Sequence, residues 1–60
     1  MLFQDNKNHF ITIEIREGER AGKTVYKVYI NGKLLHTYNR VEKAHRKITE
    51  YIRLNDWRRL

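Results

Sequence analysis

Three histidines are the side chains of this chain best suited to acid–base or metal chemistry: His9, His36 and His45. They fall in different predicted elements with no cysteine and no ligand-spaced pair among them, so no metal site is predicted. The chain also has no cysteine or serine that could act as a nucleophile. His36 and Glu14 share one face of the predicted sheet, but an open sheet does not supply the burial that tunes pKa values for catalysis. We predict neither an enzyme nor a bound cofactor.

A second candidate for chemistry is the segment Gly-Glu-Arg-Ala-Gly-Lys-Thr at residues 18–24. Its spacing resembles a phosphate-binding loop, in which backbone amides and a lysine hold nucleotide phosphates. Only three residues separate Gly18 from Gly22, where that loop has four, and Thr24 leads into a predicted strand instead of a helix. We therefore interpret residues 17–23 as a flexible loop between strands, and we do not predict nucleotide hydrolysis.

Positive charge dominates the composition. The chain has 13 Lys and Arg against 7 Asp and Glu, which gives a formal charge of +6 and a pI near 10.0. This excess favours a polyanionic or acidic partner, and nucleic-acid phosphates are the commonest such target. The polar start at residues 1–8 is not typical of a secretory signal, and no stretch approaches the ~20 apolar residues of a membrane span. We expect a cytoplasmic protein without membrane contact.

Alternating apolar and polar residues predict three β-strands at residues 10–16, 25–30 and 33–38. Asn31-Gly32 stands between the last two and favours a two-residue type I′ turn, because both residue types tolerate positive φ. An uninterrupted register from this turn pairs Ile30 with Lys33 and continues to the end of the hairpin.

After the third strand the period changes to that of a helix. Asn39-Arg-Val-Glu42 is typical of a capping box, and the helix is predicted over residues 40–57. Its apolar stripe recurs at spacings of three and four residues: Val41, Ala44, Ile48, Tyr51, Ile52 and Asn55.

These elements predict an α+β fold, a three-stranded antiparallel meander with one C-terminal amphipathic helix packed on one face (β-β-β-α). The chain is interpreted as a single domain, residues 1–60, in which residues 1–8 form a flexible arm. Because the core is small, we expect Trp57 or the segment Met1-Leu2-Phe3 to add burial.

The sheet face away from the helix is expected to interleave aromatic and basic side chains. Nucleic-acid platforms use this mixture, because bases stack on aromatic rings while Lys and Arg contact phosphates. Basic residues of the helix and of the loop offer a second surface for phosphates. The candidate nucleic-acid-binding residues are Arg16, Arg20, Lys23, Lys27, Tyr29, His36, Tyr38, Lys43, Arg46 and Lys47.

The plan of three strands and a helix, with the turn Tyr26-x-Val-x-Ile-Asn-Gly-Lys33 and the helix entry Tyr38-Asn-Arg-Val-Glu-Lys-Ala44, resembles small DNA-binding domains. These are the plant ethylene-response-factor type and the arm-binding domains of phage integrases. The resemblance covers residues 10–55 and implies that the open sheet face enters the DNA major groove, with Arg16, Lys27, Tyr29 and His36 as contacts. The same run also resembles the second half of a double-stranded-RNA-binding domain, without its first helix.

The leading hypothesis is a small basic protein that binds nucleic acid, with DNA favoured over RNA. The alternative is a phage- or plasmid-encoded interaction protein that binds an acidic host protein through the aromatic face. A homodimer that buries the sheet face or pairs edge strands is a third possibility.

Overall fold

The segments with alternating apolar residues form strands, and the segment with spacings of three and four forms a helix. The computed structural model describes residues 1–60. Its elements are β1 (Leu2–Gln4), β2 (Phe10–Arg20), β3 (Lys23–Ile30), β4 (Lys33–Tyr38), α1 (Val41–Asn55) and β5 (Arg58–Arg59).

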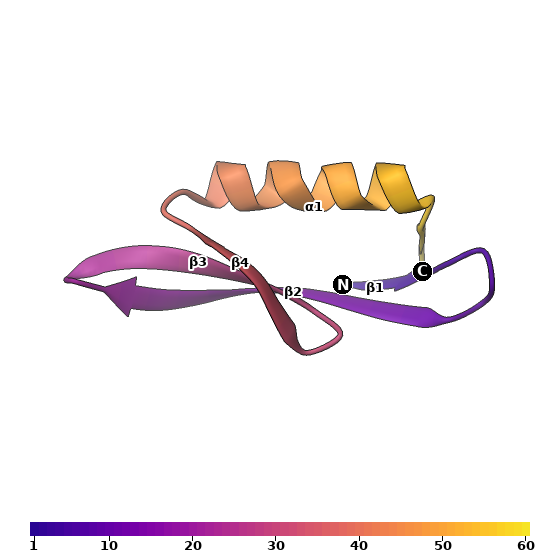
Figure 1. Cartoon of the computed structure of the whole chain (residues 1–60), viewed down its shortest axis with the longest axis horizontal. Coiled ribbons are helices and arrows are strands. Elements are labelled where there is room, and N and C mark those ends of the chain that lie inside the picture. The colour runs from indigo at the N-terminus through magenta and orange to yellow at the C-terminus, as the bar shows by residue number, and fades with distance from the viewer.

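All strands join one antiparallel sheet in the order β4-β3-β2-β1-β5, and α1 lies across one face of it (Figure 1). The predicted α+β class is confirmed, but the sheet has five strands and not three. The molecule is elongated, with extents of 42 × 19 × 15 Å, because the β2–β3 hairpin projects past the other elements.

The two additional strands come from the ends of the chain. Residues 1–8 are not a loose arm throughout, since β1 pairs with β2 and places Phe3 opposite Ile11 in the core. Phe3 is only 3% exposed, and Trp57, just before β5, packs against the same cluster. The extra burial expected from the two termini is therefore confirmed. An isolated three-residue strand carries little periodicity, so the sequence did not identify it.

β2 changes its partner in the middle of the sheet. Its first residues pair with β1, whereas residues 13–20 pair with β3. The Asn31 side-chain Oδ1 accepts the Thr12 backbone N–H at 2.9 Å, and the Asn31 N–H donates to the Thr12 carbonyl at 2.9 Å. On the other edge the Met1 amine donates to the Ile13 carbonyl at 3.0 Å, and the Ile13 N–H donates to the Met1 carbonyl at 2.9 Å. These four bonds hold the junction from both sides.

The Asn31-Gly32 turn forms as predicted, with φ of 52° and 80° and with Ile30 paired to Lys33. Beyond Tyr29 and Leu34, however, the register shifts by one residue, and Val28 pairs with His36. Leu35 is the extra residue of a β-bulge, so every later residue of β4 points to the other face from the one predicted.

The expected loop at residues 17–23 is also wrong. β2 continues to Arg20 and β3 begins at Lys23, with only Ala21-Gly22 between them. Both turn residues have positive φ, 52° and 76°, as a type I′ turn requires. Ala-Gly is a weaker turn signal than Asn-Gly, and the charged residues around it hid the alternation of the strands.

The helix is two residues shorter at its end than predicted and starts one residue later. Its N-cap is Arg40, which makes no side-chain capping bond, so the predicted capping box at Asn39 does not form. At the other end Asp56 adopts a left-handed conformation with φ of 54°. The Trp57 N–H then donates to the Ile52 carbonyl at 3.1 Å, which reverses the chain toward β5.

The core lies between the sheet and α1, where the predicted apolar stripe meets the isoleucine-rich face of β2. Ala44 and Ile48 are the buried helix residues, and Ile13 and Val28 are the largest side chains that are fully buried. The cluster is Phe3, Ile11, Ile13, Val28, Ala44 and Ile48, with Ile15, Tyr26, Ile30, Tyr38, Ile52 and Trp57 packed around it.

Truncation of Ile13 to Ala should lower the free energy of unfolding by about 2–5 kcal/mol, because it removes a central contact of this small cluster and leaves a cavity. Leu54→Ala is the matched control, since Leu54 is 74% exposed, and it should change stability by no more than about 0.5 kcal/mol. Urea denaturation followed by circular dichroism measures both. Equal losses in the two variants would contradict this placement of the core.

Asp5 organises the connection between β1 and β2 and gives stability a pH dependence. Its Oδ1 accepts the N–H groups of Lys7 and His9, each at 2.8 Å, and Oδ2 lies 3.2 Å from the His9 Nδ1. The His9 backbone N–H is the main cause that lowers the pKa of the Asp5 carboxyl below 3.8, with Lys7 and the His9 ring adding to it.

Because the folded-state pKa is depressed, the ionised carboxylate stabilises the fold above its unfolded pKa, and this contribution is lost as the pH falls through the folded value. Asp5→Asn should therefore be less stable than wild type at neutral pH. The difference should shrink between roughly pH 5 and pH 2. Chemical denaturation of both proteins across this range tests the sign, and a difference that is constant with pH would contradict it.

Candidate nucleic-acid interface

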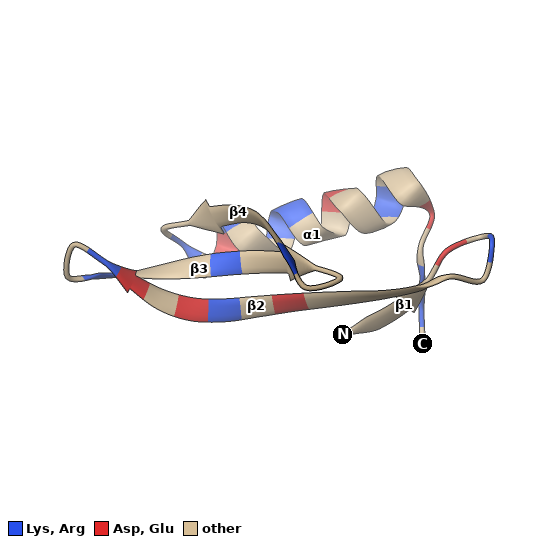
Figure 2. Cartoon of the chain, turned by 60° about the horizontal axis from the view of Figure 1, so that its bottom comes forward, with Lys and Arg blue, Asp and Glu red and all other residues tan.

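The projecting hairpin, residues 16–27 and called the arm from here on, carries opposite charges on its two faces. On one face of this two-stranded ribbon, Arg16 lies opposite Lys27, and Arg20 lies opposite Lys23. The other face carries Glu17 opposite Tyr26 and Glu19 opposite Thr24. Figure 2 shows how the charged residues gather on this half of β2, whereas the half beside β1 has few. Strand alternation therefore places the cations of the arm on one face of the ribbon and its carboxylates on the other.

This cationic face has an intrinsic cost, because like charges directly opposite each other destabilise a sheet. Gly18 lies between the two pairs, opposite Val25. A Cβ at Gly18 would lie 3.3 Å from Lys27 Cε, so the Lys27 side chain runs across the open space that this glycine leaves. Arg16, Arg20 and Lys23 are exposed to solvent and Lys27 is half-buried, so a polyanion could reach and neutralise both pairs.

A hollow of about 540 Å³, which we call the notch, opens where β4 ends. β4 pairs with β3 only as far as Tyr26, and the chain then turns away toward α1. From there to the arm tip β3 has β2 as its one partner. The notch is lined by Arg20, Ala21, Lys23, Thr24, Val25, His36, Thr37, Tyr38, Asn39 and Lys43.

A second hollow of about 310 Å³ continues from the notch along α1 and shares Tyr38 and Lys43 with it. Arg46 and Lys47 line this part together with Glu50. Lys47 is partly neutralised, because its Nζ lies 3.5 Å from the Glu50 Oε1. The other cations of the two hollows, Arg20, Lys23, Lys43 and Arg46, form no ion pair.

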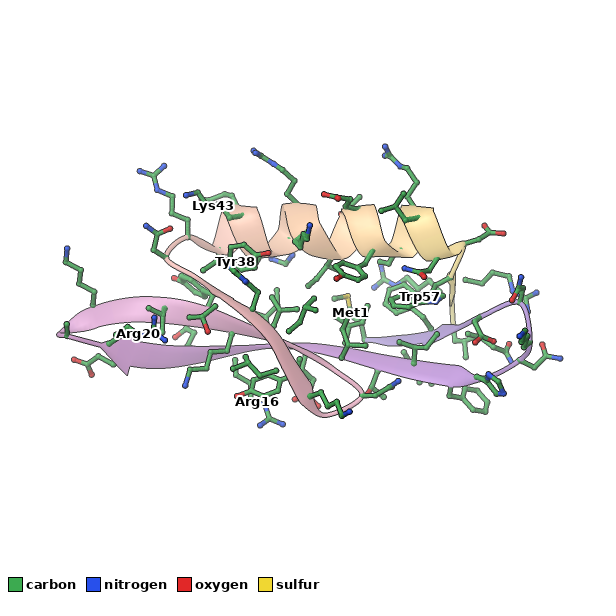
Figure 3. All side chains as sticks on the ribbon, in the orientation of Figure 1. Met1, Arg16, Arg20, Tyr38, Lys43 and Trp57 are labelled. Carbon is green, nitrogen blue, oxygen red and sulfur yellow. The ribbon has the colours of Figure 1, made fainter.

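The bulge in β4 places the predicted aromatic residues on different faces of the sheet. Because Val28 pairs with His36 and Tyr26 with Tyr38, both β4 rings lie on the helix side of the sheet, so their predicted place on the open face is wrong. Tyr38 packs against the core, and its ring centroid is 4.5 Å from that of His36. Figure 3 shows Tyr38 between sheet and helix and Arg16 on the opposite side of the sheet.

Tyr29 remains on the open face, but its ring is covered. The Arg16 guanidinium lies 4.6 Å from the Tyr29 ring centroid and also bonds the Glu14 carboxylate at 2.9 Å. The expected platform of free aromatic rings, on which bases could stack, is therefore not formed by these residues.

The ten candidate residues thus fall into two groups. Arg16, Lys27 and Tyr29 lie on the open face, and the seven others line the two hollows. Sequence reasoning missed Thr24, Thr37 and Asn39, which also line the notch. No motif signals them, because they become neighbours only through the early end of β4.

Nowhere do three side chains of the His, Cys, Asp or Glu type gather closely enough to hold a metal ion. The structure contains no helix with the length and apolar character needed to cross a lipid bilayer. Comparison with protein-family models, with curated proteins and with solved structures gives no match for this chain.

Because two like charges lie opposite each other at the arm tip, we expect that removing one of them makes the fold more stable. Lys23→Thr removes the repulsion with Arg20 and should raise the free energy of unfolding by about 0.2–1 kcal/mol at low salt. The gain should shrink in high salt, which screens exposed charges. Lys33→Thr is the matched control, since Lys33 also follows a two-residue turn but lies opposite Ile30. Denaturation at two salt concentrations compares them, and equal effects would contradict the repulsion.

Proposed function

We propose that this protein binds nucleic acid through the arm and the two hollows, with duplex DNA as the favoured ligand. The observation that carries the proposal is the convergence of unpaired cations from two parts of the fold: Arg20 and Lys23 from the arm, and Lys43 and Arg46 from α1. Such a grouping of cations suits a row of phosphates, which releases counterions when it is neutralised.

The shape of the arm favours a duplex. A two-stranded β-ribbon is one of the two kinds of element that the major groove of B-form DNA admits. The cationic face of the arm would lie toward the DNA, and its acidic face, with Glu17 and Glu19, would lie away from it. The notch lies directly beside the arm tip, so Lys43 and Arg46 are placed to contact phosphates that flank the groove.

The covered Tyr29 ring favours a duplex over a single strand. Proteins that bind single strands without sequence preference rely on exposed aromatic rings for stacking. Here the Arg16 guanidinium occupies the Tyr29 ring face, and His36 and Tyr38 contact each other on the helix side. Phosphate contacts therefore carry the binding, and sequence specificity rests on the few arm side chains that reach base edges.

Binding of a short labelled DNA duplex, measured by fluorescence anisotropy, should weaken steeply as salt rises. Lys43→Gln with Arg46→Gln should lower the affinity and reduce the slope of log K against log salt by about one for each phosphate that the variant no longer neutralises. Lys7→Gln with Lys33→Gln is the matched control, because it removes the same charge outside both hollows. This control should bind nearly as wild type does.

Two outcomes would overturn the proposal. The first is the absence of binding at low salt to duplex and single-stranded DNA alike. The second is an equal loss of affinity in the two double variants, which would mean that net charge alone attracts the DNA. Tighter binding of a single strand or of duplex RNA than of duplex DNA would reject the favoured ligand.

A further inference from the structure

His36 owes its place in the notch to the bulge in β4. In the uninterrupted register that the Asn31-Gly32 turn sets, His36 would lie on the open face of the sheet. The extra residue Leu35 moves it to the helix side, opposite Val28, where its ring lines the notch. Bulges are common beside functional sites, where they re-aim a side chain. The notch therefore contains a histidine, the side chain type that changes its charge near neutral pH.

The charged side chains that line the notch with His36 are all cations. Arg20 comes from β2, Lys23 from β3 and Lys43 from α1, and the other titratable group is the Tyr38 hydroxyl of β4. No Asp or Glu lines the notch, and His36 takes part in none of the ion pairs of the chain. A phosphate bound in the notch would supply the negative charge that this set of side chains lacks.

The His36 ring is free to bond such a phosphate. Its side chain is exposed and makes no hydrogen bond within the chain. A neutral imidazole has one N–H donor, whereas a protonated imidazole has two. The Tyr38 ring lies beside it, with the centroids 4.5 Å apart and the planes inclined at 48°, and an aromatic ring at this distance attracts a cation. Protonation of the ring thus adds a charge and a second donor for phosphate.

We propose that His36 takes up a proton when the notch binds a phosphate of the DNA backbone. This inference rests on the proposed function, and it adds that pH controls the affinity for DNA. The proton and the phosphate are two ligands of one site, so each strengthens the binding of the other by the same factor. Because the bound state then holds more protons than the free state, the association constant rises as the pH falls from about 8 to 5.

The other two histidines lie outside the two hollows. His9 belongs to the connection between β1 and β2, where its Nδ1 is 3.2 Å from the Asp5 carboxylate. His45 is exposed on α1 and lines neither hollow. The Asp5 carboxyl has a pKa below 3.8, mainly because it accepts the His9 backbone N–H, so it keeps its charge in this pH range. A duplex held in the two hollows therefore brings a phosphate to His36 and not to the other two rings.

Proton uptake can be counted on the wild-type chain, without any substitution. Calorimetric titration with a short DNA duplex, in two buffers with different heats of ionisation, gives the number of protons bound on forming the complex. The duplex carries no terminal phosphates, because a phosphate monoester itself titrates near pH 6. Near pH 6.5, roughly the midpoint of an ordinary histidine, wild type should take up a measurable fraction of one proton. Binding without net uptake would overturn the proposal.

Substitutions then assign the proton to one ring. Fluorescence anisotropy at constant salt should show wild type binding the duplex about fivefold or more tightly at roughly pH 5.5 than at pH 8. His36→Gln should lose this rise and bind at every pH about as wild type does at pH 8. His36→Arg has a permanent charge, so it should bind at every pH about as wild type does at pH 5.5. His45→Gln is the matched control and should keep the rise.

The outcomes separate this inference from the proposed function. A His36→Gln variant that keeps the full rise, or a His45→Gln variant that loses it, would overturn the assignment to His36. Binding that depends on salt but not on pH would overturn the inference and leave the proposed function intact. Absence of binding at every pH would overturn both. Circular dichroism of each variant confirms that a change in affinity does not come from unfolding.

Discussion

The structure depends on the point where β2 passes from one partner strand to the next. At Thr12 and Ile13 the strand leaves β1 and joins β3, and backbone groups on both edges are satisfied by Asn31 on one side and Met1 on the other. Ile13, at 1% exposure, anchors the core at the same place. This junction lets a chain of 60 residues build a sheet longer than its helix. The part of the sheet that α1 does not cover is the arm, which forms the candidate interface together with the two hollows beside it.

The sequence predicted the elements with strong periodicity, and it failed where one residue changes the geometry. The isoleucine alternation of β2, the Asn31-Gly32 turn and the helix stripe were all confirmed. The bulge at Leu35 has no signal of its own, because leucine fits a regular strand equally well. Its consequence is large, since it transfers two aromatic residues from the open face to the helix side.

The candidate site was predictable in composition but not in arrangement. Charge alone pointed to the arm tip and to α1, and both contribute cations to the two hollows. That these cations converge depends on where β4 stops, which is a tertiary property and not a local one. The segregation of charge on the arm follows directly from strand alternation, once residues 17–20 and 23–26 are recognised as strands and not as a loop.

The position of Met1 has a practical consequence for handling the protein. Its amine lies in the β1–β2 ladder and is bonded to the Ile13 carbonyl. Residues fused ahead of Met1, such as an affinity tag, would continue the line of β1 and run along β2 from Glu14 onward. A tag there would be held at high effective concentration beside the backbone groups of β2 that β1 does not pair. Leu60, whose N–H donates to the Leu2 carbonyl at 3.1 Å, ends at the opposite border of the sheet and is the safer point of attachment.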